Sequence, residues 1–248
     1  MKPSVCYIKK GALSLFLSFL LLQHTSAQNN VPTDKMLSKI RVKPDSYKMM
    51  MYVIRDTNRR EFGESLVTIE NKDGKVFVTQ DTKVYNMPSK WIDSTVALSK
   101  GLAPVYHSSM NMQRDMNLQF GSAIVKGSYN DKMKKKTTGI EDTVSGKYFD
   151  SNLYPFLISW LPLEEGYTAT VPIYDYSSTD KHGITKVTIT DVRKTSIPFN
   201  GGSINVFEVT VQNISNNISK YYVGVKDKRI YRIDSKSGGG SMQMLRVN

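Results

Sequence analysis

The chain has 248 residues, with 34 lysines and arginines against 22 aspartates and glutamates, a formal net charge of +12. This length fits one domain whose core needs no cross-links. Its single cysteine is Cys6, so a chain cut after residue 27 would have no disulfide, thiolate metal site or iron–sulfur cluster.

Residues 1–27 have the three-part layout of a secretory signal peptide. Three lysines precede an apolar run over residues 11–22, and small polar residues follow as far as Ala27. The run is shorter than the about 18–20 residues of a membrane span. We expect cleavage after Ala27, with an uncleaved anchor as the alternative, and a periplasmic or secreted bacterial protein with no membrane span.

Residues 28–46 are polar and predict a loose lead-in segment. From residue 47, alternating apolar and polar residues, with turn signals such as Asp73-Gly74, predict short strands. Residues 91–98 also fit a helix, but their threonine and valine favour a strand. The expected strands cover residues 47–55, 62–70, 76–85, 91–98, 104–109, 116–120, 123–129, 139–144, 167–176, 184–192, 203–214, 219–225, 229–234 and 241–247.

One apolar segment, residues 151–163, interrupts this pattern and predicts a short buried helix. Ser151 or Asn152 is expected to cap it, Pro155 suits its first turn, and Pro162 ends it. With turn signals every 8–12 residues elsewhere, residues 47–248 predict a single, mainly β domain. We expect an antiparallel meander curled into an open or half β-barrel, with the helix packed against it.

The sequence contains no recognisable catalytic, cofactor or metal site. His107 and His182 have no second histidine or carboxylate at ligand spacing. No Gly-x-Ser-x-Gly elbow is present, although a Ser–His–Asp triad stays open because its members can be far apart in sequence. The neighbouring carboxylates at 141–142 and 164–165 are typical of solvated loops. We therefore expect a protein that is not an enzyme.

Aromatic and methionine side chains are numerous in the predicted strands, and they either fill an ordinary core or line an apolar cavity between sheet and helix. For the cavity reading, the expected lining residues are Trp91, Tyr106, Phe120, Phe156 and Trp160.

Without the three lysines of the signal, 31 basic residues face 22 acidic ones, a net charge of +9. Export excludes nucleic acid as the expected partner. The densest cluster, Lys134, Lys135 and Lys136, is either a solvated hairpin tip or a contact for anionic lipid headgroups.

Several segments carry a resemblance to a known family. They are residues 102–106, the approach at residues 149–152, the helix and turn at residues 153–167, and the closing strands at residues 220–225 and 229–234. Over roughly residues 45–248 the chain resembles a bacterial envelope family known as domain of unknown function 3108. That family is similar to the LolA/LolB-type lipoprotein carriers, which implies an open β half-barrel closed by helices around an apolar cavity.

The leading hypothesis is an exported, non-enzymatic envelope protein that shelters lipid or lipoprotein acyl chains, since each buried methylene contributes about 0.8 kcal/mol. One alternative is a structural or interaction protein that binds glycan or another envelope protein. A third is a hydrolase with an unrecognised site. They predict, respectively, an apolar cavity, a filled core with exposed aromatic residues, and a polar cleft where a histidine or two carboxylates converge.

Overall fold

A computed structural model describes residues 31–177, 182–213, 215, 217–237 and 240–247, so the predicted signal peptide lies outside the described residues. In this part of the chain no helix is long and apolar enough to cross a membrane. The two helices are α1 (Asp34–Leu37) and α2 (Tyr154–Trp160). The strands are β1 (Asp45–Arg55), β2 (Asn58–Lys72), β3 (Lys75–Val84), β4 (Trp91–Leu98), β5 (Pro104–Met110), β6 (Arg114–Phe120), β7 (Ile124–Asp131), β8 (Lys136–Thr143), β9 (Phe149–Asp150), β10 (Ala169–Asp175), β11 (Gly183–Phe199), β12 (Gly202–Asn213), β13 (Ile218–Gly224), β14 (Ile230–Ser237) and β15 (Gly240–Val247).

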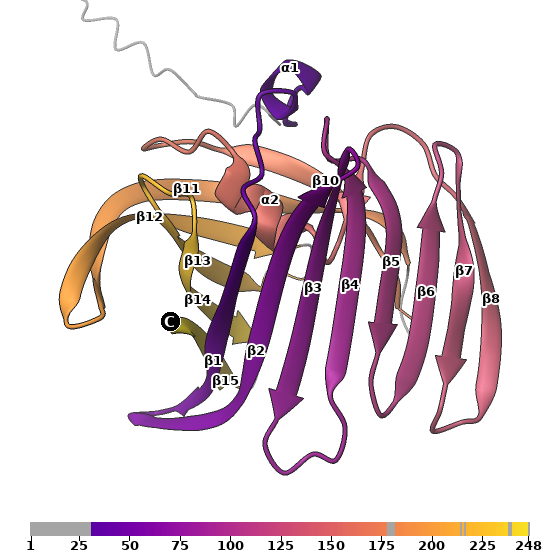
Figure 1. Ribbon diagram of the computed structural model, residues 1–248, viewed down its shortest axis with the longest axis horizontal. Coiled ribbons are helices and arrows are strands. Elements are labelled where there is room, and N and C mark those ends of the chain that lie inside the picture. Colours follow the sequence, from indigo (N-terminus) through magenta and orange to yellow (C-terminus); the bar gives the residue numbers. More distant parts are fainter. Residues whose placement is uncertain (1–30, 178–181, 214, 216, 238–239, 248) are drawn as a thin grey trace, which may run out of the picture.

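All these strands belong to one curled sheet that does not close. Their order is β8-β7-β6-β5-β4-β3-β2-β1-β15-β14-β13-β12-β11-β10-β9. Strands β1 to β8 form one antiparallel meander and β10 to β15 form a second, and β1 pairs with β15 where the two meet (Figure 1). The predicted mainly β, curled and open architecture is therefore confirmed. The short β9 pairs with β10 in parallel.

Local sequence explains most of the strands. In β1, Tyr47, Met49 and Met51 are buried while Lys48 and Met50 between them are not, which is the period-two pattern of a half-buried sheet. The residues of the predicted Asp73-Gly74 turn have φ angles of 52° and 71°. Positive φ at both positions is what a tight two-residue hairpin requires, and glycine adopts it without strain.

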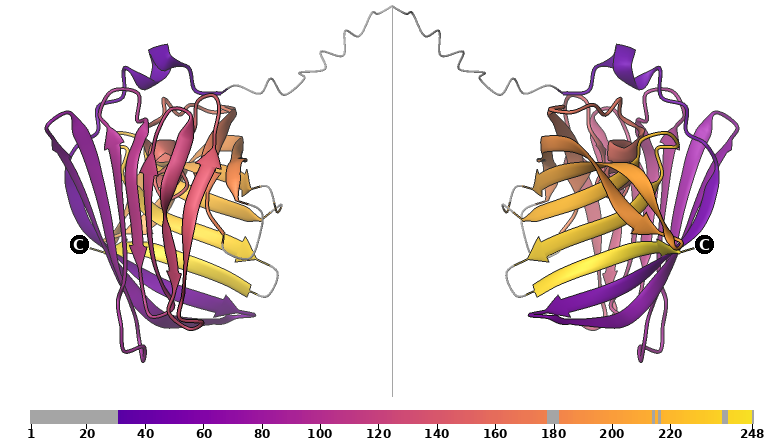
Figure 2. Two further views of the ribbon diagram at one scale, coloured as in Figure 1. Left: turned by 90° about the vertical axis from the view of Figure 1, so that its right-hand side faces the viewer. Right: turned by 90° about the vertical axis from the view of Figure 1, so that its left-hand side faces the viewer.

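Helix α2 fills the hollow of the curl. Phe156, Leu157 and Ile158 are at most 3% exposed and belong to a core that includes residues of both meanders. Figure 2 shows α2 enclosed between the two halves of the sheet. Burying each such side chain contributes about 1.5–3 kcal/mol, so α2 ties the halves together. It is shorter than predicted, and its N-cap is Leu153, which makes no side-chain capping hydrogen bond.

Side chains span the gap near the open edge of the sheet. A second core cluster contains Met116, Leu118, Val125 and Ile140 from β6 to β8, and it also contains Tyr174 from β10. Strands β6 to β8 and strand β10, which are distant in the sheet order, are thus joined by packing rather than by backbone hydrogen bonds.

The described part of the lead-in differs from the expected loose segment. Thr33 caps α1 by accepting a hydrogen bond from the Met36 N–H at 3.3 Å. Leu37, Ile40 and Val42 are buried in the main core. A helix of four residues is too short to show a helical period in the sequence, so tertiary packing determines its structure.

Candidate functional site

The structure distributes the predicted cavity residues over several places. Phe156 and Trp160 lie together on α2, with ring centroids 6.3 Å apart. Phe120 packs edge-on against Tyr174 in the second core cluster, at 5.8 Å. Tyr106 is half-buried on β5, next to His107 in the strand and therefore on the other face of the sheet.

Trp91 lies apart from the other four predicted residues. It is 40% exposed and lines a separate cavity that also contains His107. The five predicted residues therefore do not form one site, and Phe156 and Trp160 are the pair that the structure brings together.

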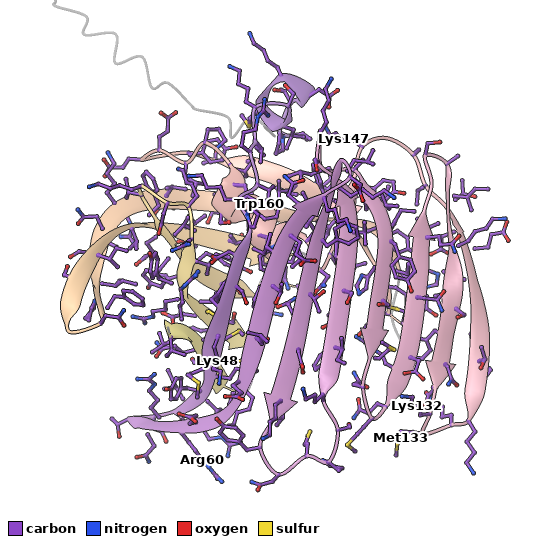
Figure 3. The ribbon with its side chains drawn as sticks, viewed as in Figure 1. Lys48, Arg60, Lys132, Met133, Lys147 and Trp160 are labelled. Carbon is purple, nitrogen blue, oxygen red and sulfur yellow. The ribbon has the colours of Figure 1, made fainter. Side chains whose placement is uncertain are left out.

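The predicted lysine cluster lies elsewhere. Lys134 and Lys135 are in the turn between β7 and β8, and Lys136 begins β8. The Lys134 side chain is 73% exposed, with Nζ 3.7 Å from an Asp131 carboxylate oxygen. Figure 3 shows the labelled turn residues Lys132 and Met133 at the end of the sheet opposite Trp160. These lysines do not surround the aromatic pair on α2.

A different surface surrounds that aromatic pair, and we call it the Trp160 groove. It consists of two adjoining cavities of about 360 and 480 Å³ that share Arg41, Trp160 and Lys228. The first reaches Phe156 and Ile69, and the second reaches Met36, Ile40, Leu161 and Pro162. The groove thus lies where the lead-in, the end of α2 and the β13–β14 turn meet. Its size is that of a small-molecule site, about 300–1,000 Å³.

Cations dominate the rim of the Trp160 groove. Its lining contains seven cationic side chains and two carboxylates, Asp45 and Asp227. Both carboxylates already have partners. Arg246 donates to both oxygens of Asp45 at 2.9 Å, and Tyr231 donates to Asp227 at 2.6 Å. The cations are Lys35, Lys39, Arg41, Lys43, Lys226, Lys228 and Arg229.

Most of these cations lack an acidic partner. Among the described residues, Arg229 pairs with Asp45 at 3.4 Å, and the other six cations make no ion pair with a described carboxylate. Arg41 donates to the backbone carbonyls of Ser38 and Ile40 at 2.7 and 3.0 Å, which orients its guanidinium but neutralises no charge. The groove therefore has a strong positive excess beside an aromatic floor.

Lys228 lies in a partly desolvated position. Its Nζ lies 5.0 Å from the centroid of the Phe207 ring, and burial lowers the pKa of this lysine below its ordinary value. The turn that carries it is tightly built. A Cβ at Gly224 would lie 2.0 Å from Asp227 Oδ1 and 2.9 Å from the Tyr231 ring. A partly desolvated cation attracts an anion more strongly than one in water does.

The sequence identified the aromatic pair, but it did not identify the cations that accompany it. Lys226, Lys228 and Arg41 come from segments that are distant along the chain and meet only after β1 has paired with β15. An isolated basic residue has no pattern that marks it as part of a site. The described residues also contain no cluster of histidine, cysteine and carboxylates able to hold a metal.

Comparison with known proteins places the fold in context. A family model described as "Protein of unknown function (DUF3108)" matches residues 46–246. A crystal structure of a β-barrel-like protein of domain of unknown function DUF1849 from Brucella abortus superimposes with a TM-score of 0.53 at 9% identity. The match covers 84% of this chain and 98% of that one, which shows a shared fold. No curated protein matches the chain.

Proposed function

We propose that this chain, which belongs to the DUF3108 family, is an exported, non-enzymatic protein of the bacterial envelope that binds an anionic amphiphile in the Trp160 groove. The observation that carries this proposal is the set of cations without acidic partners around Trp160 and Phe156. The ligand class is an acyl chain that bears an anionic headgroup, as in a phospholipid.

The apolar part of the groove suits the chain of such a ligand. The partly buried Trp160 and Met36 present carbon surface to the two cavities, which also reach the buried Phe156, Ile40 and Leu161. The inner side of α2 is packed in the core, so the groove accommodates part of an acyl chain rather than a whole lipid tail. At about 0.8 kcal/mol for each buried methylene, a short segment is enough for micromolar binding once the headgroup adds its share.

The charged part suits the headgroup. A cluster of positive charges beside low-dielectric walls concentrates the electric field and accelerates the association of an anionic ligand. Two of the cations, Lys226 and Lys228, lie on one turn, and a headgroup held between that turn and Arg41 would leave its chain beside Trp160. In this proposal Arg41 and Lys228 take the headgroup role that the sequence assigned to Lys134, Lys135 and Lys136.

The sequence contains two tryptophans, which permits a direct test. Trp91→Phe leaves Trp160 as the sole tryptophan, so its emission reports on the groove. We expect lysophosphatidylglycerol, titrated below its micellar concentration, to shift this emission and to bind at least about tenfold more tightly than lysophosphatidylcholine with the same acyl chain.

Charge reversal identifies the cations responsible. Arg41→Glu with Lys228→Glu should abolish the preference for the anionic lipid, while Lys134→Glu with Lys136→Glu is the matched control at the remote turn. The proposal fails if neither lipid changes the Trp160 emission, or if both bind equally and the groove variant binds as the parent does.

A further inference from the structure

A second cavity, which we call the His107 cavity, lies between the two halves of the curl. It has a volume of about 350 Å³ and is lined by residues of β4, β5 and β6 on one side and of β10 and β11 on the other. Its lining shares no residue with the Trp160 groove.

A buried carboxylate organises one wall of the His107 cavity. Asp150 of β9 is 0% exposed and accepts hydrogen bonds from Thr95 Oγ1 at 2.5 Å and from the Asn152 N–H at 3.2 Å. His107 Nδ1 lies 2.8 Å from the same carboxylate. Because an ionised carboxylate only accepts, Nδ1 carries the proton of this bond and Nε2 is the position left for another partner.

No sequence pattern marks this pair, because its members are 43 positions apart in the chain. The network also has a structural role. It fastens the end strand β9 to β4 and β5 across the interior of the curl. That role accounts for His107 Nδ1, but it does not account for the rest of the cavity wall.

Three polar atoms of the cavity wall have no hydrogen-bond partner among the described residues. They are His107 Nε2, Arg114 Nε and Thr185 Oγ1, each buried and without a hydrogen bond to any described residue. His107 is itself only 5% exposed. A buried polar atom without a partner costs about 1–3 kcal/mol. Three of them from β5, β6 and β11, gathered in one cavity, indicate a site built for a polar ligand.

The remaining lining decides the class of ligand. Two cations, Arg114 and Lys186, face two carboxylates, Asp93 and Asp175, so the cavity has no excess of charge to favour a simple anion. The lining also includes three aromatic side chains, Trp91, Tyr154 and Tyr176. Balanced donors and acceptors suit hydroxyl groups, each of which can donate and accept, while the C–H faces of a sugar ring pack on aromatic rings.

We infer that the His107 cavity binds a small saccharide, which contacts His107 and Arg114 from one half of the sheet and Thr185 from the other. His107 Nε2 pairs with a ligand hydroxyl, which donates to the neutral ring or accepts from the imidazolium, and the Arg114 Nε–H donates to a ligand oxygen. The exposed part of the Trp91 ring, whose Nε1 donates to Ser109 Oγ at 3.3 Å, provides a stacking surface.

A histidine in a polar cleft is also what the hydrolase alternative predicts. A Ser–His–Asp triad needs a nucleophile hydrogen-bonded to the second ring nitrogen. His107 Nε2 has no such bond to any residue that the structure describes. The geometry therefore favours binding over nucleophilic catalysis.

Tryptophan emission again isolates the site. Trp160→Phe leaves Trp91 as the reporter, and the probes are glucose, N-acetylglucosamine, glucuronate and their short oligomers, with inorganic phosphate as the anion arm. We expect at least one saccharide to change the Trp91 emission saturably, and phosphate to leave it unchanged. Absence of a response to every saccharide, or a response to phosphate alone, overturns the inference.

Thr185→Val is the decisive variant, because it keeps the shape of the side chain and removes only the unpaired hydroxyl. Replacing an unpartnered buried hydroxyl with a methyl group should leave the free protein as stable or more stable. The same change should weaken saccharide binding about tenfold. A variant that loses stability, or that binds the sugar as the parent does, contradicts the assignment. Arg41→Glu, in the Trp160 groove, is the control and should bind the saccharide normally.

Discussion

The Trp160 groove and the His107 cavity use polar side chains in opposite ways. In the groove the two carboxylates are occupied by Arg246 and Tyr231. Most of the groove cations have no acidic partner in the described part of the chain, so the surface has an excess of positive charge. In the cavity the charged side chains balance, and three buried polar atoms have no hydrogen bond to any residue that the structure describes. The groove therefore attracts a ligand from a distance, while the cavity selects one by short-range geometry.

The two sites also differ in what they contribute to the fold. The groove cations are peripheral, whereas the wall of the cavity contains the Asp150 network that fastens β9. Changes to the Asp150 network should therefore affect stability and binding together, whereas changes on the groove rim should affect binding alone.

The largest effect is expected for Asp150→Ala. It removes the acceptor shared by Thr95, His107 and the Asn152 N–H, and breaking a buried network of this kind costs about 3–5 kcal/mol. Urea unfolding followed by circular dichroism measures the loss. The matched change Glu141→Gln breaks only the exposed pair with Lys126 and should cost less than about 1 kcal/mol. Equal losses in the two variants would mean that the network does not hold β9 in place.

Salt should separate the two binding sites. Raising the ionic strength from about 0.05 to about 0.5 M shortens the screening length several-fold. Binding of lysophosphatidylglycerol reported by Trp160 should weaken by about tenfold, whereas saccharide binding reported by Trp91 should change by less than about twofold. A saccharide response that falls as steeply as the lipid response would show that the cavity, too, works through net charge.

The pH dependence should report on His107. Burial opposes protonation of this ring, but the charge and hydrogen bond of Asp150, with a smaller contribution from Asp93 and opposed by Arg114, raise its pKa above the ordinary value. A histidine with a raised pKa in the folded state stabilises the fold fully below its unfolded pKa of about 6.5. That contribution is lost as pH rises through the folded value.

Urea unfolding of the parent and of His107→Gln, from mildly acidic to mildly alkaline pH, tests this direction of the pH dependence of stability. The parent should lose stability relative to the variant as the pH rises. A difference that stays constant with pH, or that grows, would show that the imidazolium form is not the one the fold favours.

The smallest effect is expected at the β7–β8 turn. Lys134 is highly exposed and its nearest carboxylate is 3.7 Å away, so charge reversal there should alter stability by less than about 0.5 kcal/mol. Binding of the anionic lipid should change by about twofold or less. A larger loss than that of the Arg41 and Lys228 variant would return the headgroup role to this turn, as the sequence first suggested.

Much of the fold could be predicted because its causes are local. The hairpin at Asp73-Gly74 depends on residue types that accept positive φ, and β4 has the predicted bounds, residues 91–98. The two-residue strand β9 could not be predicted, since two residues carry no period. Its position depends on Asp150 meeting Thr95 and His107, a contact that exists only in three dimensions.

The sites were less predictable than the fold. Phe156 and Trp160 could be named from the sequence because an apolar helix is conspicuous in a β-rich chain. The residues that surround Trp91 could not be named in this way. The similarity to LolA-type carriers stays a prediction, while membership in the DUF3108 family is shown. No sequence pattern predicts that Arg114 Nε and Thr185 Oγ1 have no hydrogen bond to a described residue, because this depends on which groups the fold places beside them.

The pairing of β1 with β15 has a consequence for how the chain folds during synthesis. Lys48 lies opposite Val247, so one side of β1 has no strand to bond with until the last strand has been made. Long-range pairings of this kind slow folding, and an unpaired strand edge invites association with other chains. While the chain is being made, its earliest strand therefore stays unpaired on that side for the longest time, where a holding chaperone would shield it. A circular permutant that joins β15 to β1 and opens between β8 and β9 would make every neighbouring pair in the sheet except β9–β10 a simple hairpin, and it should fold with far less need for such help.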